Sequence, residues 1–283
     1  MTWISLTFGR PVGRLVLLGI SAYFVAFAPK ARRASRDYLR RALGREPGLA
    51  DIARHVHAFA STIHDRVYLL ADRFDLFDIE VEGEPLMHDL LGRGEGALLF
   101  GAHLGSFEVV RALGRRHPGL RIALTMFEDN ARKIKATLEA INPAARPEII
   151  PLGQVDTMLR VRDALEDGQF VGLLADRSLD ADETRSVPLL GDTARLPVGA
   201  FRMAAMLRHR IVFMAGLYLG GNRYRIRFVE LADFSQVERG ARAAAVDTAL
   251  LAYARELERC CRDAPDNWFN FYDFWARSEP TAT

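Results

Sequence analysis

Two short stretches of this sequence hold side chains that could carry out acid–base chemistry. In the first, His103 lies in the small-residue loop GAHLGS, and Glu108 follows it five residues later. A histidine whose second ring nitrogen is held by a carboxylate can act as a general base near neutral pH. The loop glycines let a substrate approach the backbone closely. The spacing therefore predicts His103 as a general base and Glu108 as the acid that orients it.

The second stretch is the pair Asp176–Arg177, which directly follows the apolar run FVGLLA. Taken alone, such a pair indicates a surface salt bridge. Because parallel strands end at the same edge of a sheet, we expect this pair to lie near His103. An arginine in that position could bind a phosphate or stabilise a developing oxyanion. We therefore assign Asp176 and Arg177 to substrate binding or oxyanion stabilisation.

Several other kinds of chemistry lack their sequence signatures. The chain contains no G-x-S-x-G, no Walker loop, no G-x-G-x-x-G and no H-E-x-x-H. Its two cysteines, Cys260 and Cys261, are adjacent, which gives no C-x-x-C metal pattern and fits a reducing compartment. The formal net charge of +2 does not indicate nucleic-acid binding. We expect no metal or cofactor, and a base without a protein nucleophile suggests direct transfer to an acceptor.

The elements around His103 are typical of an α/β sheet. Ala97–Phe100 reads as a buried strand and Phe107–Arg116 as an amphipathic helix, so His103 lies where ligands bind in such sheets. Alternation along the rest of the chain predicts a mixed, mostly parallel sheet flanked by helices. Further strands are expected at Phe77–Glu82, Leu120–Met126, Glu148–Pro151, Phe170–Ala175, Ile211–Leu219 and Tyr224–Leu231. Further helices are expected at Leu49–Phe74, Pro85–Leu91, Asn130–Ile141, Val155–Glu166, Pro197–Leu207 and Ala241–Arg262.

An uncharged apolar stretch, Leu15–Ala28, stands near the start of the chain. It is shorter than the ~20 residues of a comfortable membrane span. One interpretation is a signal peptide ending in the pattern A-F-A, although we expect the following Pro29 to block cleavage. A second is a buried core helix. The third, which we favour, is a membrane anchor or interfacial helix with Trp3 and Tyr23 as interfacial aromatic residues.

A basic run follows the apolar stretch directly. Such a run binds anionic lipid and stays on the cytoplasmic side of a membrane. Its members are Lys30, Arg32, Arg33, Arg36, Arg40, Arg41 and Arg45. We therefore predict that residues 1–46 form a membrane-associated helical segment and that residues 47–283 form the catalytic domain.

Taken together, these motifs resemble those of the bacterial lipid A biosynthesis (late) acyltransferases, within the lysophospholipid acyltransferase superfamily. GAHLGSFE is similar to the H-x4-E/D motif of that family. Other segments also occur in the order expected of the family. They are the apolar and basic N-terminal helices, the strand FVGLLADR and the segment VPLLGDTARLPVGAFRMAAM. That segment carries the pattern G-x-x-A-x-x-P-x-G, and the resemblance covers roughly residues 10 to 275.

The resemblance implies an acyltransferase on the cytoplasmic face of the bacterial inner membrane, working without metal or nucleotide. It implies that a fatty acyl chain passes from acyl carrier protein to a hydroxyl of a lipid acceptor such as a lipid A precursor. Carried over by position, His103 is the base and Glu108 its partner. Arg177 would meet the acceptor or the oxyanion.

Departures from the family pattern leave the acceptor open. Ser106 and Phe107 stand where family members often carry asparagine and tryptophan, and Arg177 stands where they often carry glutamine. The tail NWFNFYDFW also lacks the W-x-W-x-H-x-R ending of the family. Aryl-polyene-type lipids, lysophospholipids and amino-acid lipids are therefore alternative acceptors. Two other classes also stay open: a thioester or lipid hydrolase in which water replaces the acceptor at His103, and a non-catalytic lipid-binding protein.

Overall fold

Within the described residues, seven strands pair into one sheet in the order β1-β9-β8-β2-β5-β3-β4. The computed structural model describes residues 2–116, 119–127, 148–154, 156–177 and 183–275. Every neighbouring pair is parallel except β8 with β9, so the predicted mixed, mostly parallel sheet is confirmed. The strands are β1 (Asp78–Glu82), β2 (Leu98–Gly101), β3 (Ile122–Phe127), β4 (Glu148–Leu152), β5 (Phe170–Leu174), β8 (Arg210–Tyr218) and β9 (Arg223–Asp233).

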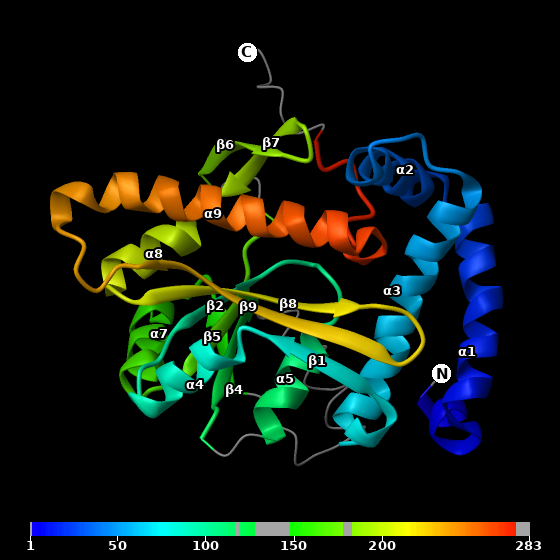
Figure 1. Cartoon of the computed structure of the whole chain (residues 1–283), viewed down its shortest axis with the longest axis horizontal. Helices are drawn as coiled ribbons and strands as arrows, with labels where there is room; N and C mark the ends of the chain where they lie inside the picture. The colour runs from blue at the N-terminus through cyan, green and yellow to red at the C-terminus, as the bar shows by residue number, and fades with distance from the viewer. Residues whose placement is uncertain (1, 117–118, 128–147, 155, 178–182, 276–283) are drawn as a thin grey trace.

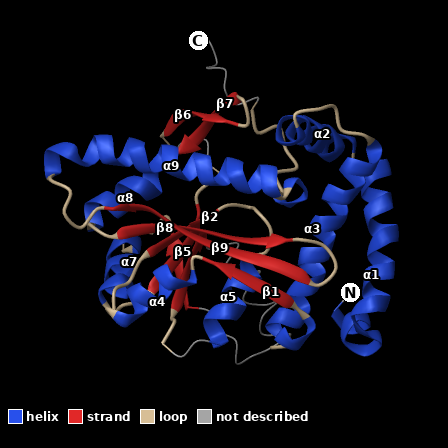
Figure 2. Ribbon diagram, in the orientation of Figure 1, coloured by secondary structure: helices blue, strands red, loops and turns tan. Residues whose placement is uncertain are grey.

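Residues along the central strand β2 alternate between two cores, one on each face of the sheet. Leu98 and Phe100 point into one core and Leu99 into the other, as the period-two geometry of a strand requires. Helices α8 (Gly199–Leu207) and α9 (Arg242–Asp263) cover the first core, and α4 (Glu84–Gly92) and α5 (Phe107–Arg116) cover the second (Figures 1 and 2). The strand end that carries His103 is thus fixed by packing on both sides.

The helices begin and end within a few residues of the predicted bounds. The helix predicted at Asn130–Ile141 lies outside the described residues. The helices after the N-terminal pair are α3 (Leu49–Leu70), α4 (Glu84–Gly92), α5 (Phe107–Arg116), α7 (Thr157–Glu166), α8 (Gly199–Leu207) and α9 (Arg242–Asp263).

A two-stranded hairpin was not anticipated from the sequence. Strands β6 (Thr184–Leu189) and β7 (Asp192–Pro197) pair antiparallel beside α9. The turn residues Leu190 and Gly191 have φ values of 55° and 86°, and positive φ at both turn positions matches the twist of paired strands. Buried apolar side chains fix the hairpin to the first core, although charged residues interrupt its apolar pattern.

The apolar N-terminal segment forms helix α1 (Thr2–Phe27), and the basic run forms helix α2 (Pro29–Leu43). Helix α1 is kinked at Gly9 and then runs beside α3 (Figure 1). The portion Gly9–Phe27 is long and apolar enough to cross a membrane by length and composition alone. Only 17% of its apolar 18-residue stretch is buried against the rest of the protein. Because so little of it is covered, α1 is not a buried core helix.

Candidate active site

The loop that follows β2 carries His103 and is held by backbone contacts. Gly105 N donates to Asn267 O at 2.8 Å, and Phe269 N donates to His103 O at 2.8 Å. Gly105 has a φ of 65°, and a Cβ atom there would lie 2.1 Å from Gly216 O. The position therefore requires glycine, both for its backbone conformation and for the close approach of β8.

His103 and Asp176 form a hydrogen-bonded pair across two neighbouring strand ends. Because β2 and β5 run parallel with Gly101 opposite Leu174, their following residues meet at one edge of the sheet. His103 Nδ1 lies 2.8 Å from Asp176 Oδ1, and His103 N donates to Asp176 Oδ2 at 3.0 Å. The His103 side chain is 31% exposed while that of Asp176 is fully buried. Nε2 is therefore the ring nitrogen that can meet a substrate.

The C-terminal segment completes the surroundings of the Asp176 carboxylate. Trp268 Nε1 donates to Asp176 Oδ2 at 2.9 Å, and Asn270 Nδ2 donates to the same oxygen at 3.3 Å. Burial alone would raise the pKa of Asp176, but the hydrogen bonds from His103 and Trp268 outweigh it and keep this pKa below its ordinary value. Asp176 is thus a carboxylate that holds the imidazole and stabilises its protonated form.

The structure places two of the predicted site residues differently from what their spacing suggested. Glu108 was expected to hold His103, but Nδ1 of His103 is bonded to Asp176, and the buried Glu108 carboxylate lies 3.5 Å from Arg111 one turn along α5. Asp176 was expected to bind substrate, but it is buried beneath the imidazole. The physical reason is the β2–β5 register, which brings Asp176, two residues beyond the end of β5, within hydrogen-bond distance of His103 Nδ1. A catalytic role for Glu108 stays a prediction.

Arg177 lies beside this pair and is tied to the C-terminal segment. Its Nε donates to Asn270 Oδ1 at 2.9 Å and its Nη2 to Phe269 O at 3.1 Å. The guanidinium also stacks over the ring of Tyr272 at 5.4 Å. Arg177 remains exposed, so it brings positive charge to the rim of the site. Its contact with acceptor or oxyanion stays a prediction.

Sequence reasoning missed the part that the C-terminal segment plays. Trp268 is fully buried and packs edge-on against Tyr38 and Phe274, with ring centroids 5.4 and 4.7 Å away. His55 Nε2 lies 3.0 Å from Trp268 O. The overlooked signal was the pair of amides, Asn267 and Asn270, inside an aromatic run, because a buried amide must find hydrogen-bond partners.

A comparison with protein families places the whole described site inside one match. The family model described as bacterial lipid A biosynthesis acyltransferase matches residues 3–277. A search of the curated proteins finds no match.

Proposed function

Since the chain belongs to the bacterial lipid A biosynthesis acyltransferase family and is thus an acyltransferase, we propose that it transfers a fatty acyl chain from acyl carrier protein to a lipid hydroxyl. A lipid A precursor or a related glycolipid is the acceptor that the family favours. The observation that carries the proposal is the His103–Asp176 pair, in which a partly exposed imidazole rests on a buried carboxylate.

The proposed reaction uses His103 Nε2 first as a base and then as an acid. Nε2 takes the proton of the acceptor hydroxyl while the oxygen attacks the thioester carbon. The tetrahedral intermediate collapses, the carbon–sulfur bond breaks, and the proton on Nε2 passes to the departing sulfur. An ester and a free thiol result, and the enzyme returns to its starting state.

The buried partners explain why His103 suits this cycle. Asp176 accepts from Nδ1–H, which leaves the lone pair on Nε2 facing the substrate. Asp176 also stabilises the imidazolium formed after proton transfer. Arg177 is the cation that we propose for the oxyanion or for an acidic group of the acceptor, because it lies exposed next to Asp176.

The acyltransferase proposal is tested with purified protein, acyl-acyl carrier protein and candidate lipid acceptors. We expect acylated lipid to appear only when an acceptor is present, and His103→Ala to abolish transfer. Free fatty acid released at the same rate with and without acceptor would identify a hydrolase instead. Mass spectrometry of lipids from cells with and without the protein then identifies both the acceptor lipid and the length of the transferred acyl chain.

We also propose that residues 1–46 hold the enzyme at the cytoplasmic face of the inner membrane. The support is the exposed apolar surface of α1 and the basic α2 that follows it. Deleting residues 1–29 is expected to move the protein from the membrane fraction to the supernatant. Continued sedimentation of the truncated protein with membranes would refute this anchor.

A further inference from the structure

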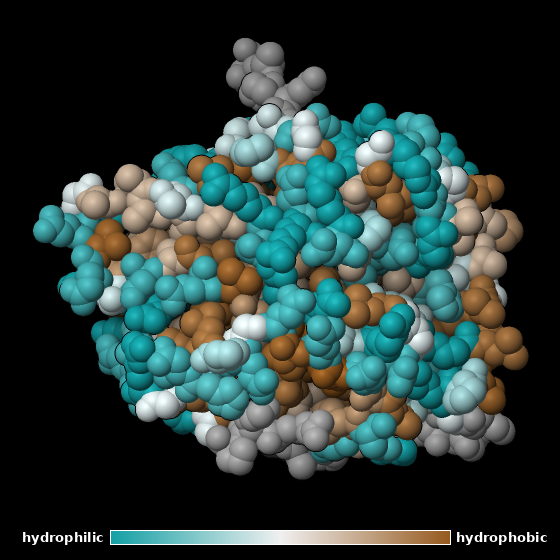
Figure 3. Space-filling model, viewed as in Figure 1, coloured by the Kyte–Doolittle hydropathy of each residue, from teal (hydrophilic) through white to brown (hydrophobic). Residues whose placement is uncertain are grey.

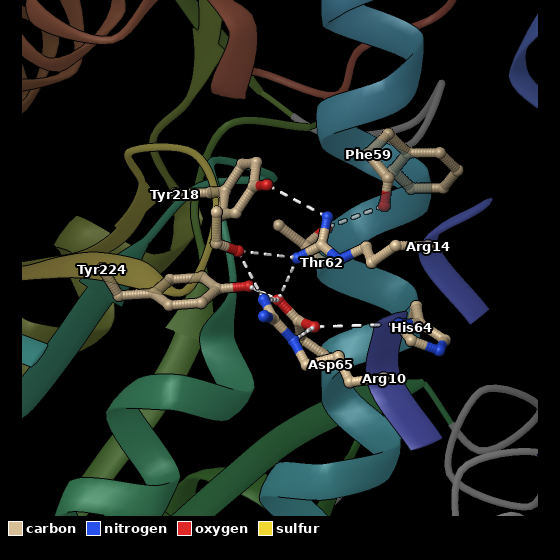
Figure 4. A network of polar contacts seen from close by, with 9 residues as sticks. Arg10, Arg14, Phe59, Thr62, His64, Asp65, Tyr218 and Tyr224 are labelled. Atoms are coloured by element: carbon tan, nitrogen blue, oxygen red, sulfur yellow. Dashed lines mark hydrogen bonds and ion pairs between the residues drawn. The ribbon is translucent and has the colours of Figure 1, made fainter. Parts of the chain in front are cut away.

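Two arginines of the apolar helix α1 are bound to one buried carboxylate of the domain (Figure 4). Arg10 donates to both oxygens of Asp65, at 2.8 and 3.0 Å, and Arg14 Nη2 donates to Asp65 Oδ2 at 2.7 Å. Tyr224 in β9 donates its hydroxyl to the same carboxylate at 2.8 Å. The Asp65 side chain is fully buried. This network joins α1, α3 and the sheet at one point.

The same two arginines lie over aromatic rings of the domain. The guanidinium of Arg10 lies 5.1 Å from the ring centre of Phe77, and that of Arg14 lies 5.3 Å from the ring centre of Tyr218. Burial favours the neutral form of Asp65, but the arginines and His64 lower its pKa overall, so the carboxylate stays charged. Removing α1 from this place would leave a buried charge without its partners, which is a costly state.

The contact between α1 and α3 continues along the helix beyond this network. Gly13 packs so closely on His64 that a Cβ atom would lie 2.2 Å from His64 Nε2. Leu17 and Ser21 are buried on the same side, and Ser21 Oγ lies 3.3 Å from His57 Nδ1. From Arg10 to Ser21, therefore, α1 lies lengthwise on the domain rather than projecting from it.

The side of α1 that faces away from α3 is apolar and bare. Leu15 and Phe27 are 70% and 71% exposed, and no charged residue occurs from Leu15 to Ala28. Figure 3 shows this hydrophobic surface along the edge of the molecule where Figure 1 places α1. The exposed apolar side chains are Val12, Leu15, Val16, Leu18, Tyr23, Phe24 and Phe27.

Exposed basic side chains adjoin this apolar surface. Helix α2 buries one face in the domain through Tyr38 and Leu39 and leaves basic residues on the other. These residues are Lys30, Arg33, Arg36 and Arg40. An apolar helix face next to a row of cations fits the acyl and headgroup regions of an anionic lipid leaflet.

We propose that α1 lies in the plane of the membrane, with its outer face in one leaflet, and does not cross the bilayer. The inference rests on the membrane location proposed above and specifies its geometry. A crossing helix would have to carry Arg10 and Arg14 away from Asp65 and expose the polar side of Ser21 to lipid. The docked helix keeps those groups in the domain and gives only its apolar side to the leaflet.

Side-specific labelling separates the two geometries. Thr2→Cys places a thiol at the first residue of α1, and Ser186→Cys places one on the exposed surface of β6. The native chain is the control, since Cys260 and Cys261 are both buried. The two variants are compared in sealed inner-membrane vesicles that are either right-side out or inside out. An impermeant maleimide, which reaches only the outer surface of a vesicle, should label both variants in the same type of vesicle. Labelling from opposite sides would overturn the in-plane geometry, whereas absence of the protein from the vesicles would overturn the membrane location itself.

Binding to vesicles tests the leaflet as the occupant of this surface. The double variant Leu15→Asp/Leu18→Asp should reduce partition into phosphatidylglycerol vesicles by about tenfold or more, because each leucine loses its transfer into lipid. Leu159→Asp is the matched control, because Leu159 of α7 is 53% exposed, close to the 55% of Leu18, and this variant should bind normally. Unchanged vesicle binding together with conversion of a dimer to a monomer would show that a second copy covers α1, and would refute the proposal.

Discussion

Replacing Asp176 by asparagine tests the assignment of the base most directly. Trp268 Nε1–H and the backbone N–H of His103 both point at Asp176 Oδ2. The asparagine oxygen should therefore take that position, which turns its NH2 group toward His103 Nδ1. Nδ1 must then accept a hydrogen bond, so the imidazole proton moves to Nε2. A protonated, neutral Nε2 cannot remove the proton of the acceptor hydroxyl.

The size of the loss follows from this wrong tautomer. In serine-protease triads the same aspartate-to-asparagine change lowers kcat by about 10⁴-fold. Asp176 is fully buried and bonds Nδ1 at 2.8 Å, so the geometric consequence is the same here. We expect kcat to fall by about 10³- to 10⁴-fold, or roughly 4 to 5.5 kcal/mol of activation free energy. KM should change little, because the carboxylate does not touch the substrate.

The assay is acyl transfer from acyl-acyl carrier protein at saturating lipid acceptor, with circular dichroism to confirm that the variant is folded. Glu108→Gln is the matched comparison, since it makes the same chemical change at the other candidate carboxylate. We expect it to lose less in kcat than Asp176→Asn does, because Asp176 is the carboxylate bonded to His103 Nδ1. Equal losses in the two variants, or an Asp176→Asn enzyme within tenfold of the native one, would refute Asp176 as the partner of His103.

Three further results are expected. Trp268→Phe removes one hydrogen bond to Asp176 and should lower kcat about tenfold; an unchanged kcat would show that the indole only packs. Burial lowers the pKa of His55 to about 4, so the unfolded chain binds more protons between pH 6.5 and 4, and the free energy of unfolding should fall by about 1.4 kcal/mol per pH unit as pH drops through this window. A His55→Gln variant with the same pH slope would contradict this. Gly105→Ala should cost about 2 kcal/mol or more of stability by urea unfolding, and more than Gly191→Ala, which has positive φ but open space around it.

Local patterns in the sequence were sufficient to locate the His103 loop. An apolar strand, two glycines and an amphipathic helix follow one another within one short stretch, so each signal supports the next. The rule that parallel strands end at one edge also brought Asp176 and Arg177 to the same place. These features depend on neighbours in the chain or on a general property of sheets, and both can be read without coordinates.

Choosing between carboxylates required the pairing of distant segments. Asp176 lies 73 residues from His103, and only the register of β2 with β5 sets their distance. Likewise, Arg10 and Arg14 stand just before the apolar stretch, and nothing near them in the sequence indicates that Asp65 of α3 is their partner. An ion pair between residues so far apart leaves no local pattern, because neither partner constrains the residues next to the other.

The C-terminal segment also has a consequence for the time at which the enzyme becomes active. A ribosome makes His103 and Asp176 well before Trp268, which lies 92 residues beyond Asp176. Until residues 267–270 have been made, the His103 loop lacks its backbone contacts to Asn267 and Phe269. Helix α1, by contrast, makes its polar contacts to Asp65 and to the hairpin of β8 and β9, all of which precede residue 267 in the chain. The polar partners of α1 are therefore synthesised before the last partners of the His103 loop.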